Sequence, residues 1–129
     1  MNDLFLFSRS MIETPQVFKA IQAQVNFCPK AVYYENPQGT DMQVSLEGRL
    51  IFQLSKLKRQ HVYLDDAQKA KYKDFYCLSL HFADIERVFK LIAPALSPFQ
   101  FVVGMDDDDY LPMFELNEIS KLTEHLKNI

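Results

Sequence analysis

The spacing of hydrophobic positions divides the chain into short strands and amphipathic helices. Both faces of Leu4–Ser8 are apolar, which is typical of a short, fully buried strand. Apolar and polar residues alternate over Met42–Leu46, which indicates a strand with one exposed face. Between them, apolar residues recur every three or four positions over Pro15–Asn26, as in a helix that buries one stripe.

The rest of the chain follows the same two patterns. We expect further strands at Lys30–Glu35, Leu50–Leu54, Val62–Leu64, Phe75–Phe82 and Phe99–Gly104, and further helices at Ala67–Lys73, Asp84–Pro94 and Glu118–Lys127. Helices segregated around antiparallel strands define the α+β class. The sequence therefore predicts a single α+β domain over residues 1–129, with a mainly antiparallel sheet of about five to six strands, two main helices and a C-terminal helix.

Several residues are expected to begin or end these elements. The hydroxyl of Thr14 is suited to cap the first helix, since Pro15 follows it at a position that needs no amide hydrogen. Gly48 and Arg49 are placed to form a tight turn between two strands, and Asn117 to cap the last helix.

Composition agrees with one compact domain. The 129 residues include 11 Phe and no Trp, so aromatic packing should be largely phenylalanine. No apolar run approaches the length of about 18 residues that a membrane span needs, and the N-terminal segment does not resemble a signal peptide. Cys28 and Cys77 have no ligand or redox spacing, so we expect two buried thiols in a reducing, cytosolic compartment.

Charge is distributed unevenly along the chain. Residues 49–74 carry seven Lys and Arg against three acids, whereas residues 84–129 carry nine acids against four Lys and Arg. Four of these acids are consecutive and precede an apolar group, and the candidate partner-binding residues are Asp106, Asp107, Asp108, Asp109, Tyr110, Leu111 and Met113. Adjacent carboxylates repel one another, so a basic surface elsewhere in the fold or on a partner is expected to compensate them.

The four aspartates do not match a known calcium loop. Counted from Asp106, the sixth position is Leu111 instead of glycine, and the twelfth is Asn117 instead of glutamate. His61, His81 and His125 do not stand at metal-ligand spacing with one another or with the cysteines. The sequence predicts neither a metal site nor a cofactor.

Catalysis and nucleic-acid binding are not expected either. Cys77 and Ser79 share a strand face with His81, but residues two apart in a strand are separated by about 7 Å, which is beyond hydrogen-bond reach. The sequence has no GxSxG motif and only three glycines, too few for a phosphate-binding loop. The basic residues 49–74 could contact phosphates, but the isoelectric point of about 5.5 argues against a nucleic-acid partner.

These features favour a small cytosolic binding protein. Our hypothesis is an immunity or antitoxin-like inhibitor that blocks a basic bacterial toxin, such as a nuclease, through its acidic loop. One alternative is a small-ligand or enzymatic domain with an aromatic pocket that is polar at Tyr33, Tyr76 and His81. The other is a homo-oligomeric scaffold, in which the basic and acidic segments meet across the two-fold axis of a dimer.

Overall fold

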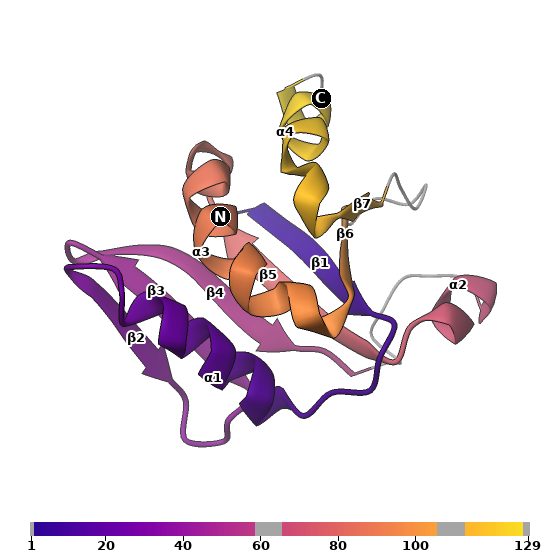
Figure 1. Ribbon diagram of the computed structural model, residues 1–129, viewed down its shortest axis with the longest axis horizontal. Coiled ribbons are helices and arrows are strands. Elements are labelled where there is room, and N and C mark those ends of the chain that lie inside the picture. The colour runs from indigo at the N-terminus through magenta and orange to yellow at the C-terminus, as the bar shows by residue number, and fades with distance from the viewer. Residues whose placement is uncertain (1, 59–65, 106–112, 128–129) are drawn as a thin grey trace.

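One antiparallel sheet runs through the whole protein (Figure 1). The computed structural model describes residues 2–58, 66–105 and 113–127. The strands are β1 (Asn2–Ser8), β2 (Ala31–Glu35), β3 (Asp41–Leu46), β4 (Arg49–Lys56), β5 (Asp74–Leu80), β6 (Phe101–Met105) and β7 (Phe114–Glu115). Their order in the sheet is β2-β3-β4-β5-β1-β6-β7, and each neighbouring pair is antiparallel. The predicted α+β class is confirmed, with seven strands in place of five to six.

The two main helices lie side by side against one face of the sheet (Figure 1). The helices are α1 (Thr14–Val25), α2 (Asp66–Lys71), α3 (Ile85–Leu96) and α4 (Ile119–Lys127), with single 3-10 turns at Phe82–Asp84, Ser97–Phe99 and Leu116–Glu118. The short α2 lies at one end of the sheet, and α4 packs beside α3 and β7. None of the helices in the described part of the chain is long and apolar enough to cross a membrane.

The main hydrophobic core fills the space between the sheet and the helices α1 and α3. From α1 it takes the predicted stripe of Val17, Phe18, Ile21 and Val25, all of which are buried. From the sheet it takes alternate residues of each strand, so that Leu6 of β1 lies opposite Tyr76 of β5 and Val103 of β6. Burial of each large apolar side chain contributes about 1.5–3 kcal/mol, so this layer dominates the stability of the fold.

A second, smaller cluster covers part of the opposite face of the sheet. It consists of the buried residues Phe7, Tyr72, Phe75 and Val102, with Phe5, Leu57 and Met113 packed against it. The ring of Phe7 meets those of Tyr72 and Phe75 at centroid distances of 5.5 and 5.8 Å. This second cluster holds the chain that follows α2 against the inner strands of the sheet.

Three expected caps and turns are wrong, and other boundaries also differ: β5 ends at Leu80 instead of Phe82, and α3 continues past Pro94 to Leu96. Glu13, not Thr14, is the residue before α1, and the Thr14 hydroxyl instead hydrogen-bonds the Tyr76 hydroxyl at 3.2 Å. The β3–β4 turn consists of Glu47 and Gly48, both with positive φ, so that β4 already begins at Arg49.

The third boundary is the start of the last helix. Glu115 caps the 3-10 turn that leads into α4, and its backbone amide donates to the Glu118 carboxylate at 3.0 Å. Asn117 lies inside that turn and is not the cap. The two-residue strand β7 was not predicted, and the expected strand Val62–Leu64 lies outside the described residues.

Candidate functional site

The acidic segment, residues 106–112, joins β6 to β7 at one edge of the sheet. These strands are antiparallel, with Val102 opposite Glu115 and Val103 opposite Phe114. Asp106–Asp109, Tyr110 and Leu111 lie outside the described residues. Because both flanking strands belong to the sheet, the two ends of the acidic segment are held at a fixed place on the molecule.

Met113 holds the end of the acidic segment that leads into β7. Its side chain is half-buried against the second cluster, and its Sδ accepts a hydrogen bond of 3.1 Å from the Tyr72 hydroxyl. The backbone of Gly104 passes close beneath it, since a Cβ atom at Gly104 would lie 3.7 Å from Met113 Cγ and 3.0 Å from Phe7 Cε2. Any larger residue at position 104 would therefore have to displace the Phe7 ring.

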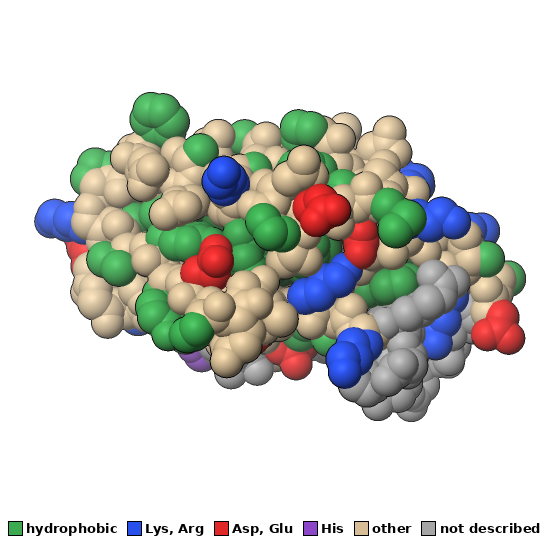
Figure 2. Space-filling model, turned by 90° about the horizontal axis from the view of Figure 1, so that it is seen from below, with side chains coloured by type: hydrophobic (Ala, Val, Ile, Leu, Met, Phe, Trp, Pro, Cys, Tyr) green, Lys and Arg blue, Asp and Glu red, His purple; other side chains and the backbone are tan. Residues whose placement is uncertain are grey.

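The contact between Tyr72 and Met113 brings the basic and acidic parts of the chain together. Tyr72 follows α2 directly, and the exposed lysines Lys71 and Lys73 flank it. Several Lys and Arg side chains lie at the right of the molecule in Figure 2, the side on which Figure 1 shows α2. Cations that could offset the acidic segment are thus present within the same chain, without a second copy.

An ion pair reinforces the same region. The Arg9 guanidinium donates to the Glu115 carboxylate at 3.0 Å, which links the end of β1 to β7. Glu115 raises the pKa of Arg9 through this hydrogen bond, while burial of the Tyr72 ring raises the pKa of its hydroxyl. Both groups keep their ordinary neutral-pH forms, so the base of the acidic segment contains a fixed cation and a neutral phenol.

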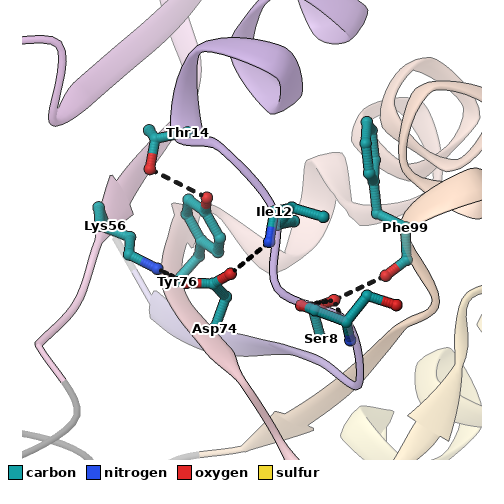
Figure 3. Close-up of polar contacts among 8 residues, drawn as sticks. Ser8, Ile12, Thr14, Lys56, Asp74, Tyr76 and Phe99 are labelled. Atoms are coloured by element: carbon teal, nitrogen blue, oxygen red, sulfur yellow. Dashed lines mark hydrogen bonds and ion pairs between the residues drawn. The ribbon is translucent and has the colours of Figure 1, made fainter.

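A polar cluster around Asp74 ties three segments together (Figure 3). The Asp74 carboxylate accepts a hydrogen bond of 2.7 Å from the backbone amide of Ile12 and also pairs with the ammonium group of Lys56. That ammonium group lies 4.7 Å from the centroid of the Tyr76 ring. All the groups in this cluster have partners inside the protein, so it is structural: it fixes the loop that enters α1 against β4 and β5.

Cys77 and Ser79 lie closer together than the sequence suggested. Their Sγ and Oγ atoms are 3.9 Å apart, and the Ser79 hydroxyl donates to the Asp3 carboxylate at 2.6 Å. The prediction that these two side chains are beyond reach was wrong, because side chains on one strand face can lean toward each other across the backbone spacing. This hydrogen bond joins β5 to β1 at two residues that lie opposite each other in the sheet.

The residues of the expected aromatic pocket do not gather in one place. Tyr33 and Tyr76 lie on β2 and β5, with β3 and β4 between them, which separates them by about 14 Å across the sheet. Tyr76 is fully buried in the main core, and this burial raises the pKa of its hydroxyl to about 12. His81 is exposed beyond the end of β5. Around Tyr76, the space between the sheet and the helices is filled by core side chains such as Phe101.

Open grooves lie on both sides of α3. One, of about 460 Å³, has a floor of Ala31, Val44, Leu46 and Ile51 and a rim of charged residues of α3. The other, of about 500 Å³, lies between α3 and α4. Both volumes are in the range of small-ligand pockets, but the grooves are shallow and open to the surface, unlike sites that enclose most of a ligand.

An unexpected feature is the exposed edge strand β2. Val32 and Tyr34 point away from the helices and are 62% and 54% exposed, among the most exposed large hydrophobic residues of the described chain. The sequence predicted a strand here but gave no sign of its position, because an edge strand and an inner strand of this length have the same composition. Hydrophobic side chains are exposed at this end of the molecule, on the left in Figure 2.

The described residues contain no group of three or more His, Cys, Asp or Glu side chains placed to hold a metal ion. Cys28 and Cys77 form no disulfide with each other and are only half-buried, so the expectation of two buried thiols was wrong in its burial. No protein-family model, curated protein or solved structure matches the chain.

Proposed function

We propose that this chain is a small cytosolic binding protein that blocks a basic protein partner, in the manner of an immunity protein that inhibits a toxin domain such as a nuclease. The acidic segment is the centre of the proposed surface. Asp106–Asp109 attract the partner, while Tyr110, Leu111 and the open side of Met113 provide apolar contact.

The observation that carries this proposal is the anchoring of the acidic segment at both ends. β6 and β7 pair with each other, and Met113 is held by Tyr72 and the second cluster. A segment whose ends are already fixed loses less conformational entropy on binding than a free tail of the same sequence. The anchored charges therefore suit recognition of one surface in one orientation.

The neighbouring lysines refine the electrostatic part of the proposal. Lys71 and Lys73 lie beside Tyr72, close to the base of the acidic segment. A negative region next to a positive one attracts a partner less strongly over long distances, but it restricts the orientations in which a partner of complementary pattern can dock. We expect the association rate with a basic partner to fall moderately with salt.

The test is a growth assay followed by binding kinetics. The product of the gene adjacent to this one is expressed in bacteria with and without this chain, and rescue of growth is scored. For a rescued pair, the variant D106N/D107N/D108N/D109N is expected to associate about tenfold more slowly at low salt, and the difference should shrink at high salt because ions screen the charges.

A matched control changes the same number of charges elsewhere. The variant E13Q/E47Q/E86Q/E124Q removes four exposed carboxylates from other parts of the described chain and should associate almost as fast as the wild type. If both variants associated equally slowly, the effect would come from the net charge of the protein and not from the acidic segment. Absence of rescue, or an association rate that the aspartate substitutions leave unchanged, would contradict the proposed function.

A further inference from the structure

Among the strands that the structure describes, β2 pairs only with β3, and this pairing determines which of its backbone groups point outward. The amide of Glu47 donates to the carbonyl of Lys30 at 3.3 Å, and the amide of Asn36 donates to the carbonyl of Asp41 at 3.0 Å. Both bonds belong to the same β2–β3 register, in which hydrogen-bonded and non-hydrogen-bonded residue pairs alternate. Even-numbered residues of β2 therefore direct their backbone groups toward β3.

The odd-numbered residues of β2 direct theirs outward. These are Ala31, Tyr33 and Glu35, and the amide of Ala31 is already bonded to the carbonyl of Cys28 at 3.3 Å. The outward set is then the carbonyl of Ala31 and both the amide and the carbonyl of Tyr33 and of Glu35. A strand edge of this kind is a template for a further strand.

We propose that two copies of this chain pair through β2, antiparallel and in register about a two-fold axis at Tyr33. In this arrangement the amide and carbonyl of Tyr33 exchange two hydrogen bonds with Tyr33 of the second copy. Each Glu35 amide donates to the Ala31 carbonyl of the other copy. The amide of Ala31, which already has a partner, is not needed. The two seven-stranded sheets become one continuous sheet.

The side chains fit the same register. On the face away from the helices, Val32 of each copy lies opposite Tyr34 of the other. The contact between these two exposed residues therefore occurs twice in the dimer. Pairs of an aromatic and a β-branched residue are among the favourable cross-strand pairs. On the helix side, Glu35 lies opposite Ala31, and its carboxylate already accepts a hydrogen bond of 2.7 Å from Tyr33. No pair in this register places like charges opposite each other.

Self-complementarity is the reason to assign this edge to a second copy. A two-fold axis at Tyr33 forms four backbone hydrogen bonds and two apolar side-chain contacts at the same time. A strand of unrelated sequence could form the backbone hydrogen bonds but not these side-chain contacts. Five residues on each side make a small interface, below the roughly 1,200 Å² that marks stable complexes, so the dimer is expected to be weak and dependent on concentration.

The first test removes one outward amide. Glu35→Pro deletes an amide that points away from β3, and proline is tolerated at such edge positions. Its control is Glu35→Ala, which loses the same carboxylate but keeps the amide. By sedimentation equilibrium, we expect Glu35→Pro to raise the dimer dissociation constant at least about tenfold over Glu35→Ala, because two bonds are lost per dimer.

The second test uses side-chain charge. V32K/Y34K places lysines opposite lysines and should be monomeric, whereas Q43K/S45K, which adds the same charges to the same face of β3, should dimerise like the wild type. V32E/Y34E should also be monomeric alone. A mixture of V32K/Y34K and V32E/Y34E should form heterodimers, because each lysine then lies opposite a glutamate.

Three results would overturn the proposal. They are a wild-type protein that stays monomeric at millimolar concentration, a dimer that Glu35→Pro and V32K/Y34K leave unchanged, and a charge-swapped mixture that stays monomeric while both variants are folded by circular dichroism. The strand β7, which follows the acidic segment, is at the opposite end of the strand order from β2. The variant D106N/D107N/D108N/D109N should therefore dimerise normally, which keeps this test separate from that of the proposed function.

Discussion

Individual polar residues connect segments that lie far apart in the sequence. The clearest case is Arg49, whose guanidinium makes two hydrogen bonds of 2.9 Å to the Asp84 carboxylate. The Asp84 side chain is 9% exposed, while that of Arg49 is 55% exposed. An almost buried acid is therefore held mainly by a partner that reaches it from the surface, across the boundary between β4 and α3, with a smaller electrostatic contribution from Arg87.

This pair leads to a prediction about pH. The hydrogen bonds from Arg49 lower the pKa of Asp84 below its ordinary value, against the opposing effect of burial. Because the pKa of Asp84 is lower in the folded protein, this carboxylate stabilises the fold at pH values above its pKa in the unfolded chain, about 3.9. The stabilisation is lost as the pH falls through the pKa of the folded state. Arg49→Gln should therefore destabilise the protein at pH 7 and much less at pH 2.5, as measured by urea unfolding.

The control for this prediction is Lys19→Gln, which removes an exposed cation from α1. Its free energy of unfolding should differ little from that of the wild type at either pH. A destabilisation by Arg49→Gln that is equally large at pH 7 and pH 2.5 would contradict the assignment, because it would indicate lost packing instead of a lost ion pair.

At the scale of elements, the turn of the β3–β4 hairpin contains a residue with a strained backbone conformation. Its two turn residues, Glu47 and Gly48, have φ angles of 53° and 82°. This combination is typical of a type I′ turn, which matches the twist of the flanking strands and favours Asn-Gly. Glycine adopts such angles without strain, but glutamate does not. Position 47 is thus a strained site in the turn of this hairpin.

Substitution of this residue should stabilise the hairpin. We expect Glu47→Asn to raise the free energy of unfolding by about 0.5–1 kcal/mol, because asparagine tolerates left-handed angles better than glutamate. The loss of the exposed 3.5 Å contact with Lys30 should matter little. Gly48→Ala, which puts a Cβ at positive φ, should have the opposite sign. Thermal unfolding of both variants measures the effect, and a destabilised Glu47→Asn would show that the strain lies elsewhere.

At the scale of the whole molecule, the strand order places β1 and β5 inside the sheet. β1 pairs with β5 on one side and β6 on the other, although these strands are more than 60 residues away in the sequence. β5 in turn pairs with β4. Within the described parts of the chain, the two outer strands, β2 and β7, each have one neighbour in the sheet. Stability should therefore decrease from the middle of the sheet toward its edges.

Amide hydrogen exchange tests this gradient. Amides of Leu6 and Leu78 should exchange only through global unfolding, with protection that matches the free energy from urea denaturation. Amides of β7 should exchange through local opening, about a hundredfold faster or more, because two residues paired on one side open at small cost. Equal protection in β1 and β7 would indicate a single cooperative unit that extends to the sheet edge.

The sequence by itself determined where most of the strands and helices lie, β7 excepted, and which residues form the buried stripe of α1. Those properties are local, since the period of the hydrophobic residues is set by the geometry of each element. Val17, Phe18, Ile21 and Val25 of α1 were all identified in this way. The α+β class followed from the order of the elements along the chain.

The tertiary structure alone decided what lies beside what. Three features depend on the order of the strands: the contact between Tyr72 and Met113, the ion pair between Arg49 and Asp84, and the edge position of β2. Strand order depends on the sum of many weak contacts between distant segments, and no local pattern encodes it. For this reason the acidic residues could be found from the sequence, whereas the contact between Tyr72 and Met113 and the edge position of β2 could not.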